Sequence, residues 1–369
     1  MSDRLTRLFT EYGQSPWLDN LKRSYITSGE LERVRSSGIR GLTSNPTIFQ
    51  KAIQGSDEYT EQFKSLIASK TSTLESYWAL VLQDIHGALD VFAPLHESSG
   101  GLDGFVSVEV DPNLAHQSEQ TLVAARQLDE RVNRANVMIK IPATVEGIPA
   151  IRTMIGEGRN VNVTLIFSLE RYQEVMDAYI QGLELLAASA PQKVSRVASV
   201  ASFFISRVDT DIDRLLEANG SEGALALCGT AAVNQAKLAY QMFVRTFSGQ
   251  RWNDLLKHGA RVQRPLWAST STKNPKYPDT LYVDSLIGPN TVNTLPDATV
   301  DAFSSHGNLA LTIDKNIDQA NTQWSQLKKF GVDVAEVATR LEREGVKSFQ
   351  NSFDELISVL LAKASELNS

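Results

Sequence analysis

The sequence predicts an α/β protein built as a (β/α)8 TIM barrel with additional helices, including a C-terminal helical extension. Strand-like runs and helical patterns alternate about eight times, which is typical of parallel strands joined by crossover helices. The chain has 369 residues, more than the roughly 250 of a typical barrel, and helix-rich stretches account for the excess. An open doubly wound sheet is the alternative, but the sequence Asp19-Asn20-Leu21-Lys22 replaces its Gly-rich turn after the first strand.

The strands are predicted from apolar runs bounded by turn residues. Residues 104–110, GFVSVEV, alternate strictly and place Glu109 on the face opposite to the valines. Residues 137–142, VMIKIP, form an apolar strand that contains Lys140 and ends at Pro142. The other predicted strands are residues 15–18, 39–42, 160–167, 196–204, 264–268 and 291–295.

The helices are predicted from apolar stripes at helical spacing and from capping residues. A stripe from Leu74 to Leu89 indicates a helix over 73–92. Ser168 is expected to cap a helix over 169–187, and Thr27 and Glu30 have capping-box spacing for a helix that ends near residue 38. Further helical patterns cover 56–69, 119–132, 148–155, much of 208–257, 314–330, 334–345 and 348–367.

Domain boundaries and location follow from composition. No linker, repeat or low-complexity tract is found, so we expect one barrel domain over residues 1–369, with about 308–369 as a helical extension packed on it.

The net charge of −7 and the lack of a dense Lys/Arg run argue against nucleic acid as a partner. Cys228 is the single cysteine, which excludes an internal disulfide. Without a secretory signal or a long apolar run, we expect a cytoplasmic protein that does not bind a membrane.

Lys140 has two interpretations. On an edge strand, its stem would pack while its ammonium group stays in water. Facing inward, it would be partly desolvated, which favours the neutral amine that attacks a carbonyl. Its neighbours at other strand ends also have mild explanations when each is taken alone: Asp19 as a helix cap, Asn45 as a turn residue and Glu109 as a solvent-side strand residue.

Position makes the catalytic interpretation stronger. In a (β/α)8 barrel, chemistry takes place where the strands end. Complementary polar residues occur at the predicted strand ends, and we expect them to form one ring: Asp19, Asn45, Glu109, Lys140, Asn162, Thr164, Ser202, Arg207 and Lys273.

Four segments resemble transaldolases. GLTSNPT (residues 41–47) and MIKIPAT (138–144) look like the two signature segments of that family, and NVTLIFS (162–168) and SFFISR (202–207) are similar to its following strand ends. The resemblance covers about 16–207 and continues more loosely over 267–289. It is to the longer bacterial branch, in which IKIPAT (residues 139–144) replaces the serine-threonine-tryptophan wording after the lysine of the best-known members. Phe203, where proline is common, and Lys273, in place of arginine, depart from the pattern.

The resemblance implies transfer of a dihydroxyacetone unit in the pentose phosphate pathway, from sedoheptulose 7-phosphate to glyceraldehyde 3-phosphate, giving erythrose 4-phosphate and fructose 6-phosphate. Lys140 would form a Schiff base with the ketose. Asp19 would deprotonate the substrate hydroxyl, and Glu109 would serve carbinolamine formation and dehydration through a water oriented by Thr164. The resemblance implies no metal and no organic cofactor.

The same resemblance implies the residues that bind sugar phosphates. Asn45 and Asn162 would hold the three-carbon unit, Ser202 would contact its hydroxyl and Phe204 would form a wall of the site. Thr43 is also expected among the substrate-binding residues. Arg207 would pair with the phosphate in bidentate fashion, with Lys273 as a second cation. The protein is expected to be a monomer or a homodimer.

Three other readings stay open at this point. A fructose-6-phosphate-type class I aldolase would use the same lysine but release free dihydroxyacetone. A pyridoxal-phosphate barrel would also form an imine on a strand lysine. A catalytically inactive barrel could act as a binding or regulatory protein, although the expected polar positions are all occupied.

Overall fold

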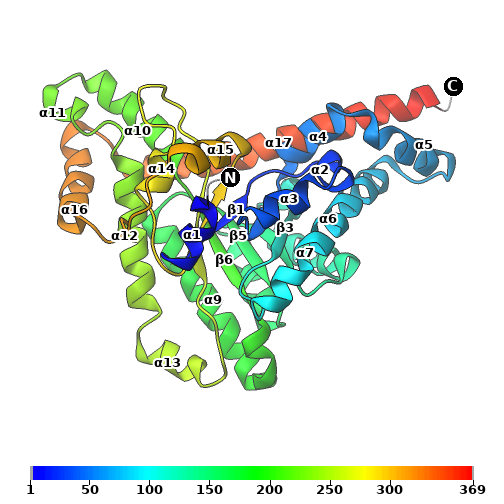
Figure 1. Cartoon of the computed structure of the whole chain (residues 1–369), viewed down its shortest axis with the longest axis horizontal. Helices are drawn as coiled ribbons and strands as arrows, with labels where there is room; N and C mark the ends of the chain where they lie inside the picture. The colour runs from blue at the N-terminus through cyan, green and yellow to red at the C-terminus, as the bar shows by residue number, and fades with distance from the viewer. Residues whose placement is uncertain (1–2, 368–369) are drawn as a thin grey trace.

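The computed structural model describes residues 3–367 and contains a closed barrel of parallel strands in the order β1 to β8 (Figure 1). Each strand pairs in parallel with its neighbours in the chain, and β8 pairs with β1. The predicted fold class is therefore confirmed. The strands are β1 (Gln14–Leu18), β2 (Gly41–Thr43), β3 (Phe105–Glu109), β4 (Val137–Pro142), β5 (Val161–Ile166), β6 (Ser199–Phe204), β7 (Arg264–Ala268) and β8 (Thr291–Leu295).

Helices surround the barrel and fill the connections between its strands (Figure 1). The α-helices are α1 (Arg4–Thr10), α2 (Arg23–Thr27), α3 (Glu30–Ser36), α4 (Pro46–Gln54), α5 (Thr60–Ala68), α6 (Thr73–Ser98), α7 (Ser118–Val132), α8 (Gly147–Gly156), α9 (Leu169–Ser189), α10 (Ser206–Asn219), α11 (Glu222–Leu225), α12 (Ala231–Thr246), α13 (Gln250–Leu256), α14 (Leu281–Asp284), α15 (Asp297–His306), α16 (Ile317–Gln326) and α17 (Val334–Leu367). The 3-10 turns are η1 (Asp57–Tyr59), η2 (Pro112–Leu114), η3 (Pro191–Arg196) and η4 (Leu327–Phe330).

The strand register explains how polar residues meet at one end of the barrel. Glu109 on β3 pairs with Lys140 on β4, and Lys140 pairs with Asn162 on β5. These three residues therefore lie in one row across neighbouring strands. Since alternate side chains point to the same face of a strand, they share the barrel interior.

The opposite, amino-terminal end of the barrel is closed by a buried carboxylate. Asp103 accepts hydrogen bonds from Ser15 Oγ at 2.8 Å, Arg40 Nε at 2.7 Å and Arg264 Nη2 at 3.0 Å. The Asp103 side chain is fully buried. These contacts tie the starts of β1, β2, β3 and β7 together, which is a structural role for that end.

The C-terminal helix α17 is longer than the sequence predicts. The chain patterns predict two helices, 334–345 and 348–367, but one helix runs through Gly345 from Val334 to Leu367. A Cβ on Gly345 would lie 3.0 Å from Leu165 Cδ2, so glycine serves close packing here and does not end the helix. Leu165 has φ +61° next to a register shift in β5. The helix therefore docks on an irregular part of the barrel.

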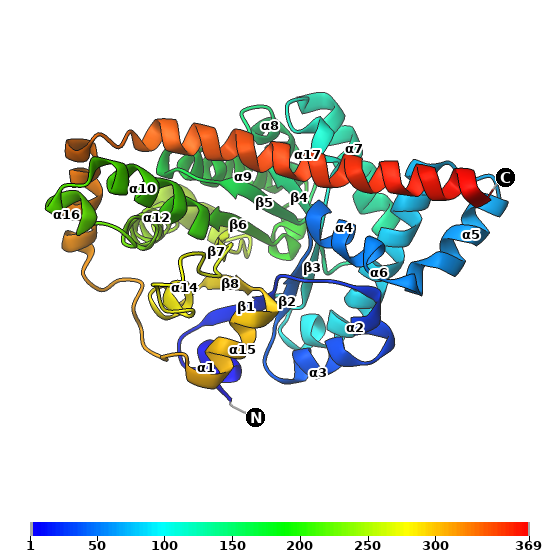
Figure 2. The ribbon, with the colours of Figure 1, turned by 90° about the horizontal axis from the view of Figure 1, so that it is seen from above.

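Figure 2 shows α17 crossing the molecule beside the barrel, from α10 and α16 at one end to α4 and α5 at the other. Arg340 on α17 pairs with Asp211 on α10. Ser352 Oγ and Thr47 Oγ1 on α4 lie 2.8 Å apart. The helix thus connects the two sides of the barrel mouth.

The two helix caps predicted from the sequence have opposite outcomes. The capping box expected at Thr27 and Glu30 is wrong, because Thr27 ends α2 and Gly29 is the N-cap of α3. The cap on α9 is confirmed, since Ser168 Oγ accepts from Arg171 N–H at 3.0 Å.

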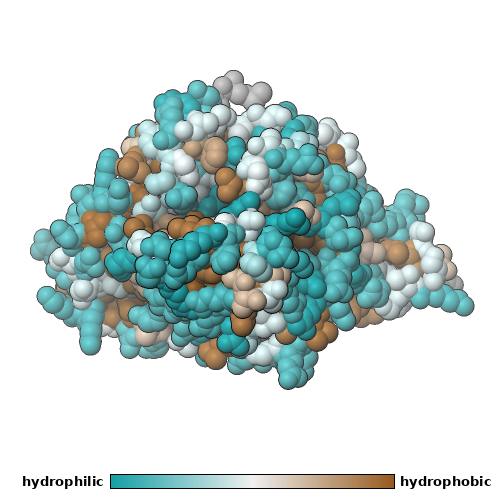
Figure 3. Space-filling view, turned by 90° about the horizontal axis from the view of Figure 1, so that it is seen from below, coloured by the Kyte–Doolittle hydropathy of each residue, from teal (hydrophilic) through white to brown (hydrophobic). Residues whose placement is uncertain are grey.

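Seen from below, hydrophobic residues form small groups separated by hydrophilic ones (Figure 3). Among residues 3–367, none of the helices is long and apolar enough to span a membrane.

Candidate active site

A pocket of about 130 Å³ lies at the carboxyl ends of the barrel strands. It is lined by most of the polar residues that were predicted to form a ring, together with several others. The lining residues are Asp19, Thr43, Asn45, Lys140, Thr164, Ser202, Phe204, Arg207, Ala268, Ser269, Ser271, Lys273, Thr294, Pro296 and Phe349.

Lys140 is the buried cationic group of this pocket. The residue is only 4% exposed, so the interpretation as an edge-strand lysine with its head in water is wrong. Its Nζ donates to the Ser44 carbonyl oxygen at 3.0 Å and lies 3.4 Å from Glu109 Oε2. Both contacts place the amine inside the barrel mouth, where a carbonyl substrate that enters the pocket could reach it.

Glu109 lies between Lys140 and an apolar wall. Burial raises the pKa of Glu109, while the nearby charge of Lys140 opposes that shift. On its other side is a cavity of about 10 Å³ whose lining includes Tyr77 and Phe353. Their rings pack edge to face with centroids 5.1 Å apart. The protonated form of Glu109 is therefore favoured to higher pH than usual, which suits an acid and base near neutral pH.

Asp19 follows β1 and is held by a pair of threonines. Thr43 Oγ1 donates to Asp19 Oδ1 at 2.7 Å, and Thr43 Oγ1 lies 2.6 Å from Thr294 Oγ1. Burial raises the pKa of Asp19, and the Thr43 hydrogen bond and the charge of Lys140 oppose it. The site thus contains two carboxyl groups whose pKa values are both raised by burial, and the charge of Lys140 opposes both shifts.

Side chains from β3, β5 and β6 are joined in a row of hydrogen bonds beneath the pocket. Asn162 Nδ2 donates to Ser107 Oγ at 3.0 Å, and Ser202 Oγ donates to Asn162 Oδ1 at 2.7 Å. These bonds fix the orientation of the Asn162 amide. Thr164 Oγ1 is buried and has no hydrogen-bond partner among residues 3–367. Buried hydroxyls usually have partners, so this oxygen is available to a bound group.

Asn45 is positioned by the helix that it begins. Its Oδ1 accepts from Ile48 N–H at 3.0 Å and thereby caps α4, with Pro46 at the first helical position. The cap holds the side chain at the pocket wall. Its NH2 group is then the end of the amide that can donate to a ligand.

Two cations stand at the rim of the pocket. Arg207, in the first turn of α10, has its guanidinium carbon 5.6 Å from the centroid of the Phe204 ring. Lys273 lies in the loop after β7, where its Nζ donates to Ser271 Oγ at 2.7 Å. Burial and the nearby charge of Arg207 lower the pKa of Lys273, and the charge of Asp19 opposes this shift. Such neighbouring cations are typical of a site for a dianion like phosphate.

The structure brings the predicted site residues together. Those outside the pocket lining, Glu109 and Asn162, contact Lys140 and Ser202 respectively. Several groups of the site were not predicted from the sequence: Ser44, whose carbonyl oxygen accepts the lysine hydrogen bond, and Ser269, Ser271, Thr294 and Phe349, which line the pocket. Ser271 could have been found from its place two residues before Lys273. Phe349 could not, because it belongs to an apolar stripe of α17 that looks like any other.

No group of three or more His, Cys, Asp or Glu residues suited to a metal ion is found in the part of the chain that the structure describes.

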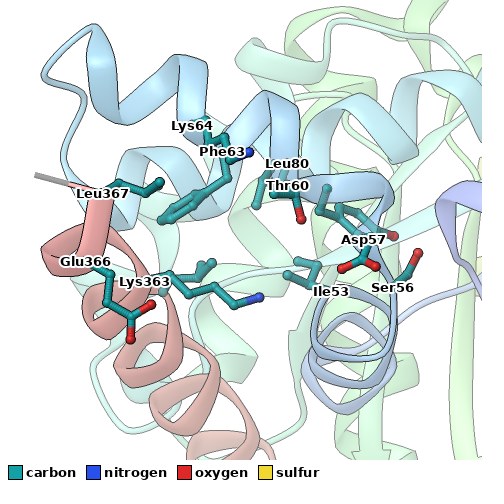
Figure 4. Close-up of a pocket in the computed structure, with 12 residues that line it drawn as sticks. Ile53, Ser56, Asp57, Thr60, Phe63, Lys64, Leu80, Lys363, Glu366 and Leu367 are labelled. Atoms are coloured by element: carbon teal, nitrogen blue, oxygen red, sulfur yellow. The ribbon is translucent and has the colours of Figure 1, made fainter.

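A separate hollow of about 320 Å³ lies between α5 and the end of α17 (Figure 4). Phe63 and Leu367 point toward each other across it, and Lys363 extends toward Ile53. Within residues 3–367, its lining comes from α4 to α6 and α17, outside the ring of polar residues.

The chain is similar to known proteins over nearly its whole length. A model of the family described as Transaldolase/Fructose-6-phosphate aldolase matches residues 16–360. The chain is 48% identical over 350 residues to a protein of Parafrankia sp. (strain EAN1pec) named Transaldolase, which covers 94% of this chain and 95% of the relative. It is 47% identical to the Transaldolase of Thermobifida fusca and 46% identical to Transaldolase 1 of Streptomyces avermitilis, with coverage of at least 94% on both sides.

Proposed function

The chain belongs to the transaldolase/fructose-6-phosphate aldolase family, and we propose that it is a transaldolase that transfers a dihydroxyacetone unit between sugar phosphates through a Schiff base on Lys140. The observation that carries the proposal is the buried Lys140 amine, 3.4 Å from the Glu109 carboxylate at the end of a barrel strand. The relatives named Transaldolase, which match nearly the whole chain, support the same activity.

The proposed reaction starts with attack of the Lys140 amine on the ketose carbonyl. Glu109 donates and accepts protons as the carbinolamine forms and then loses water, and it acts through a second water that Thr164 Oγ1 helps to orient. The protonated imine withdraws electrons, so Asp19 can take the hydroxyl proton while the carbon–carbon bond breaks and the shortened aldose leaves as an aldehyde. The enamine that remains adds to the aldehyde of the acceptor aldose, whose oxygen takes the proton back from Asp19. Water then hydrolyses the imine and releases the new ketose and the free lysine.

The binding residues divide between the two ends of the substrate. Asn45, Asn162 and Ser202 lie near Lys140 and are proposed to hold the three-carbon unit. Arg207 and Lys273 are proposed to bind the phosphate, with Arg207 as the bidentate partner. The rim cations give a local positive site on a chain whose net charge is −7, so an anionic substrate is attracted to the pocket and not to the whole surface.

An aldolase that releases free dihydroxyacetone is the second candidate, because the family includes both activities by its description. A coupled assay with fructose 6-phosphate, with and without erythrose 4-phosphate, separates them. We expect turnover to depend on erythrose 4-phosphate. Equal turnover without the acceptor would favour the aldolase.

Three further properties are proposed. We expect a cytoplasmic location, a monomer or a homodimer, and a single barrel domain with a helical extension from about residue 308 packed on it. Cell fractionation, sedimentation of the purified protein and limited proteolysis test these three expectations in turn.

A further inference from the structure

The two rim cations lie on segments that are fastened to each other. Arg207 is on α10, and Lys273 is on the β7–α14 segment (residues 269–284). At the base of these segments, Ser206 N–H donates to the Ser269 carbonyl oxygen at 3.1 Å, and the two serine hydroxyls lie 2.9 Å apart. Two like charges near each other repel, so the segment needs attachment beyond this base to keep Lys273 beside Arg207.

Two tyrosine–aspartate hydrogen bonds provide that attachment. The Tyr277 hydroxyl donates to Asp213 Oδ2 at 2.6 Å, and the Tyr282 hydroxyl donates to Asp209 Oδ2 at 2.8 Å. Asp209 and Asp213 are four residues apart on α10 and therefore share one face of the helix. Both carboxylates are buried. A hydrogen bond from a hydroxyl to a buried carboxylate is among the stronger ones in proteins.

The other oxygen of each carboxylate is also occupied. Asp213 Oδ1 accepts from Gly229 N–H at 2.9 Å, and Asp209 Oδ1 accepts from Ala232 N–H at 2.7 Å. The aspartates are thus held from the α11–α12 side and cannot turn freely. Gly229 has φ +73°, and a Cβ there would lie 2.8 Å from the Tyr277 ring, so glycine lets the ring lie against the backbone.

We propose that Tyr277 is a positioning residue for phosphate recognition, which holds Lys273 beside Arg207 through its hydrogen bond to Asp213. The inference rests on the proposed function and deepens it. Tyr277 N–H donates to the Asn274 carbonyl oxygen at 3.1 Å, in a turn that begins directly after Lys273. A shift of the tyrosine is therefore passed to the lysine through a short, hydrogen-bonded stretch of chain.

Tyr277→Phe removes the hydroxyl and keeps the ring. We expect KM for fructose 6-phosphate to rise roughly three- to tenfold, as for the loss of one hydrogen bond, while kcat changes by less than about twofold. The concentration of unphosphorylated dihydroxyacetone that half-saturates borohydride trapping on Lys140 should stay the same. The matched control is Tyr179→Phe, because the Tyr179 hydroxyl donates to the Arg261 carbonyl oxygen at 2.7 Å outside the site.

A double-mutant cycle shows whether Tyr277 acts through Lys273. In a Lys273→Ala background, Tyr277→Phe should raise KM no further, because the positioned cation is gone. The proposal is overturned if KM is unchanged by Tyr277→Phe, if KM rises equally in both backgrounds, or if dihydroxyacetone trapping weakens to the same extent. Failure of the proposed function is distinct, since the wild-type protein would then show neither trapping on Lys140 nor transfer.

Discussion

Lys140 Nζ lies 3.4 Å from Glu109 Oε2, in a barrel mouth where the two residues are 4% and 7% exposed. Burial of two opposite charges has a desolvation cost that is large unless each finds good partners. Here Glu109 Oε2 has no well-oriented hydrogen bond among residues 3–367. The pair is therefore poorly explained as a stabilising ion pair and well explained as two reacting groups kept near each other.

Lys140→Ala should abolish borohydride trapping of a ketose phosphate and reduce kcat for transfer at least about 10³-fold, because the nucleophile is lost. Mass spectrometry of the trapped protein measures the effect. Lys237→Ala is the matched control, since Lys237 is also buried and donates to a backbone carbonyl, at 2.8 Å, but outside the pocket. Trapping of Lys140→Ala at the wild-type yield would show that another amine reacts.

Glu109→Gln should lower kcat by about 10²–10⁴-fold, the usual contribution of a general acid and base. Burial raises the pKa of Glu109 above its ordinary value, so the carboxylate forms, and activity that needs it increases, as pH rises through that raised pKa. The glutamine cannot titrate, so this acid limb of the pH profile should vanish and only the limb from Asp19 should remain.

The control for Glu109 is Asp111→Asn. Asp111 also follows β3, but its carboxylate caps η2 by accepting from Asn113 N–H at 2.9 Å. We expect its pH profile to match that of the wild type. If Glu109→Gln keeps the wild-type acid limb and loses less than about twofold in kcat, Glu109 is not the proton-transfer group.

Arg207→Ala should raise KM for fructose 6-phosphate by about 10²-fold, since a bidentate charged contact contributes roughly 1.5–3 kcal/mol. Half-saturation by unphosphorylated dihydroxyacetone should change little. Arg214→Ala serves as control, because Arg214 lies on the same helix with its side chain 62% exposed and pairs with Asp211. Equal effects of Arg207→Ala on both donors would remove Arg207 from the phosphate site.

Much of the fold could be predicted from the sequence because it rests on local patterns. The bounds 264–268 and 291–295 agree with β7 and β8, and the alternation in GFVSVEV placed Glu109 opposite the valines. Strand ends in a barrel converge, so polar residues there had to meet. What local patterns could not predict is the register, which pairs Glu109 with Lys140 and Lys140 with Asn162.

The C-terminal region shows why other features could not be predicted. Glycine lowers helix propensity, so the pattern indicated two helices, yet Gly345 is where α17 approaches Leu165 closely. That contact depends on Leu165, which has a left-handed backbone conformation beside the register shift in β5. In the same way, Phe349 has the spacing of a core residue, and only the path of α17 across the barrel brings it to the pocket.

Phe349→Ala should open the pocket wall that α17 provides. The enamine on Lys140 can either add to an aldehyde or take a proton, after which water adds to the imine and releases dihydroxyacetone. A wider pocket admits more water, so we expect free dihydroxyacetone to rise several-fold relative to transfer product.

Phe→Ala in a core costs about 3–5 kcal/mol, so Phe349→Leu should be compared as a milder change with a smaller shift in the same direction. Leu356→Ala is the control for packing, because Leu356 is fully buried in the same helix but does not line the pocket. Thermal unfolding should show losses of stability for Phe349→Ala and Leu356→Ala, whereas only the Phe349 variants should change the ratio of release to transfer. The same ratio in Phe349→Ala and Leu356→Ala would mean that α17 affects the reaction only through stability.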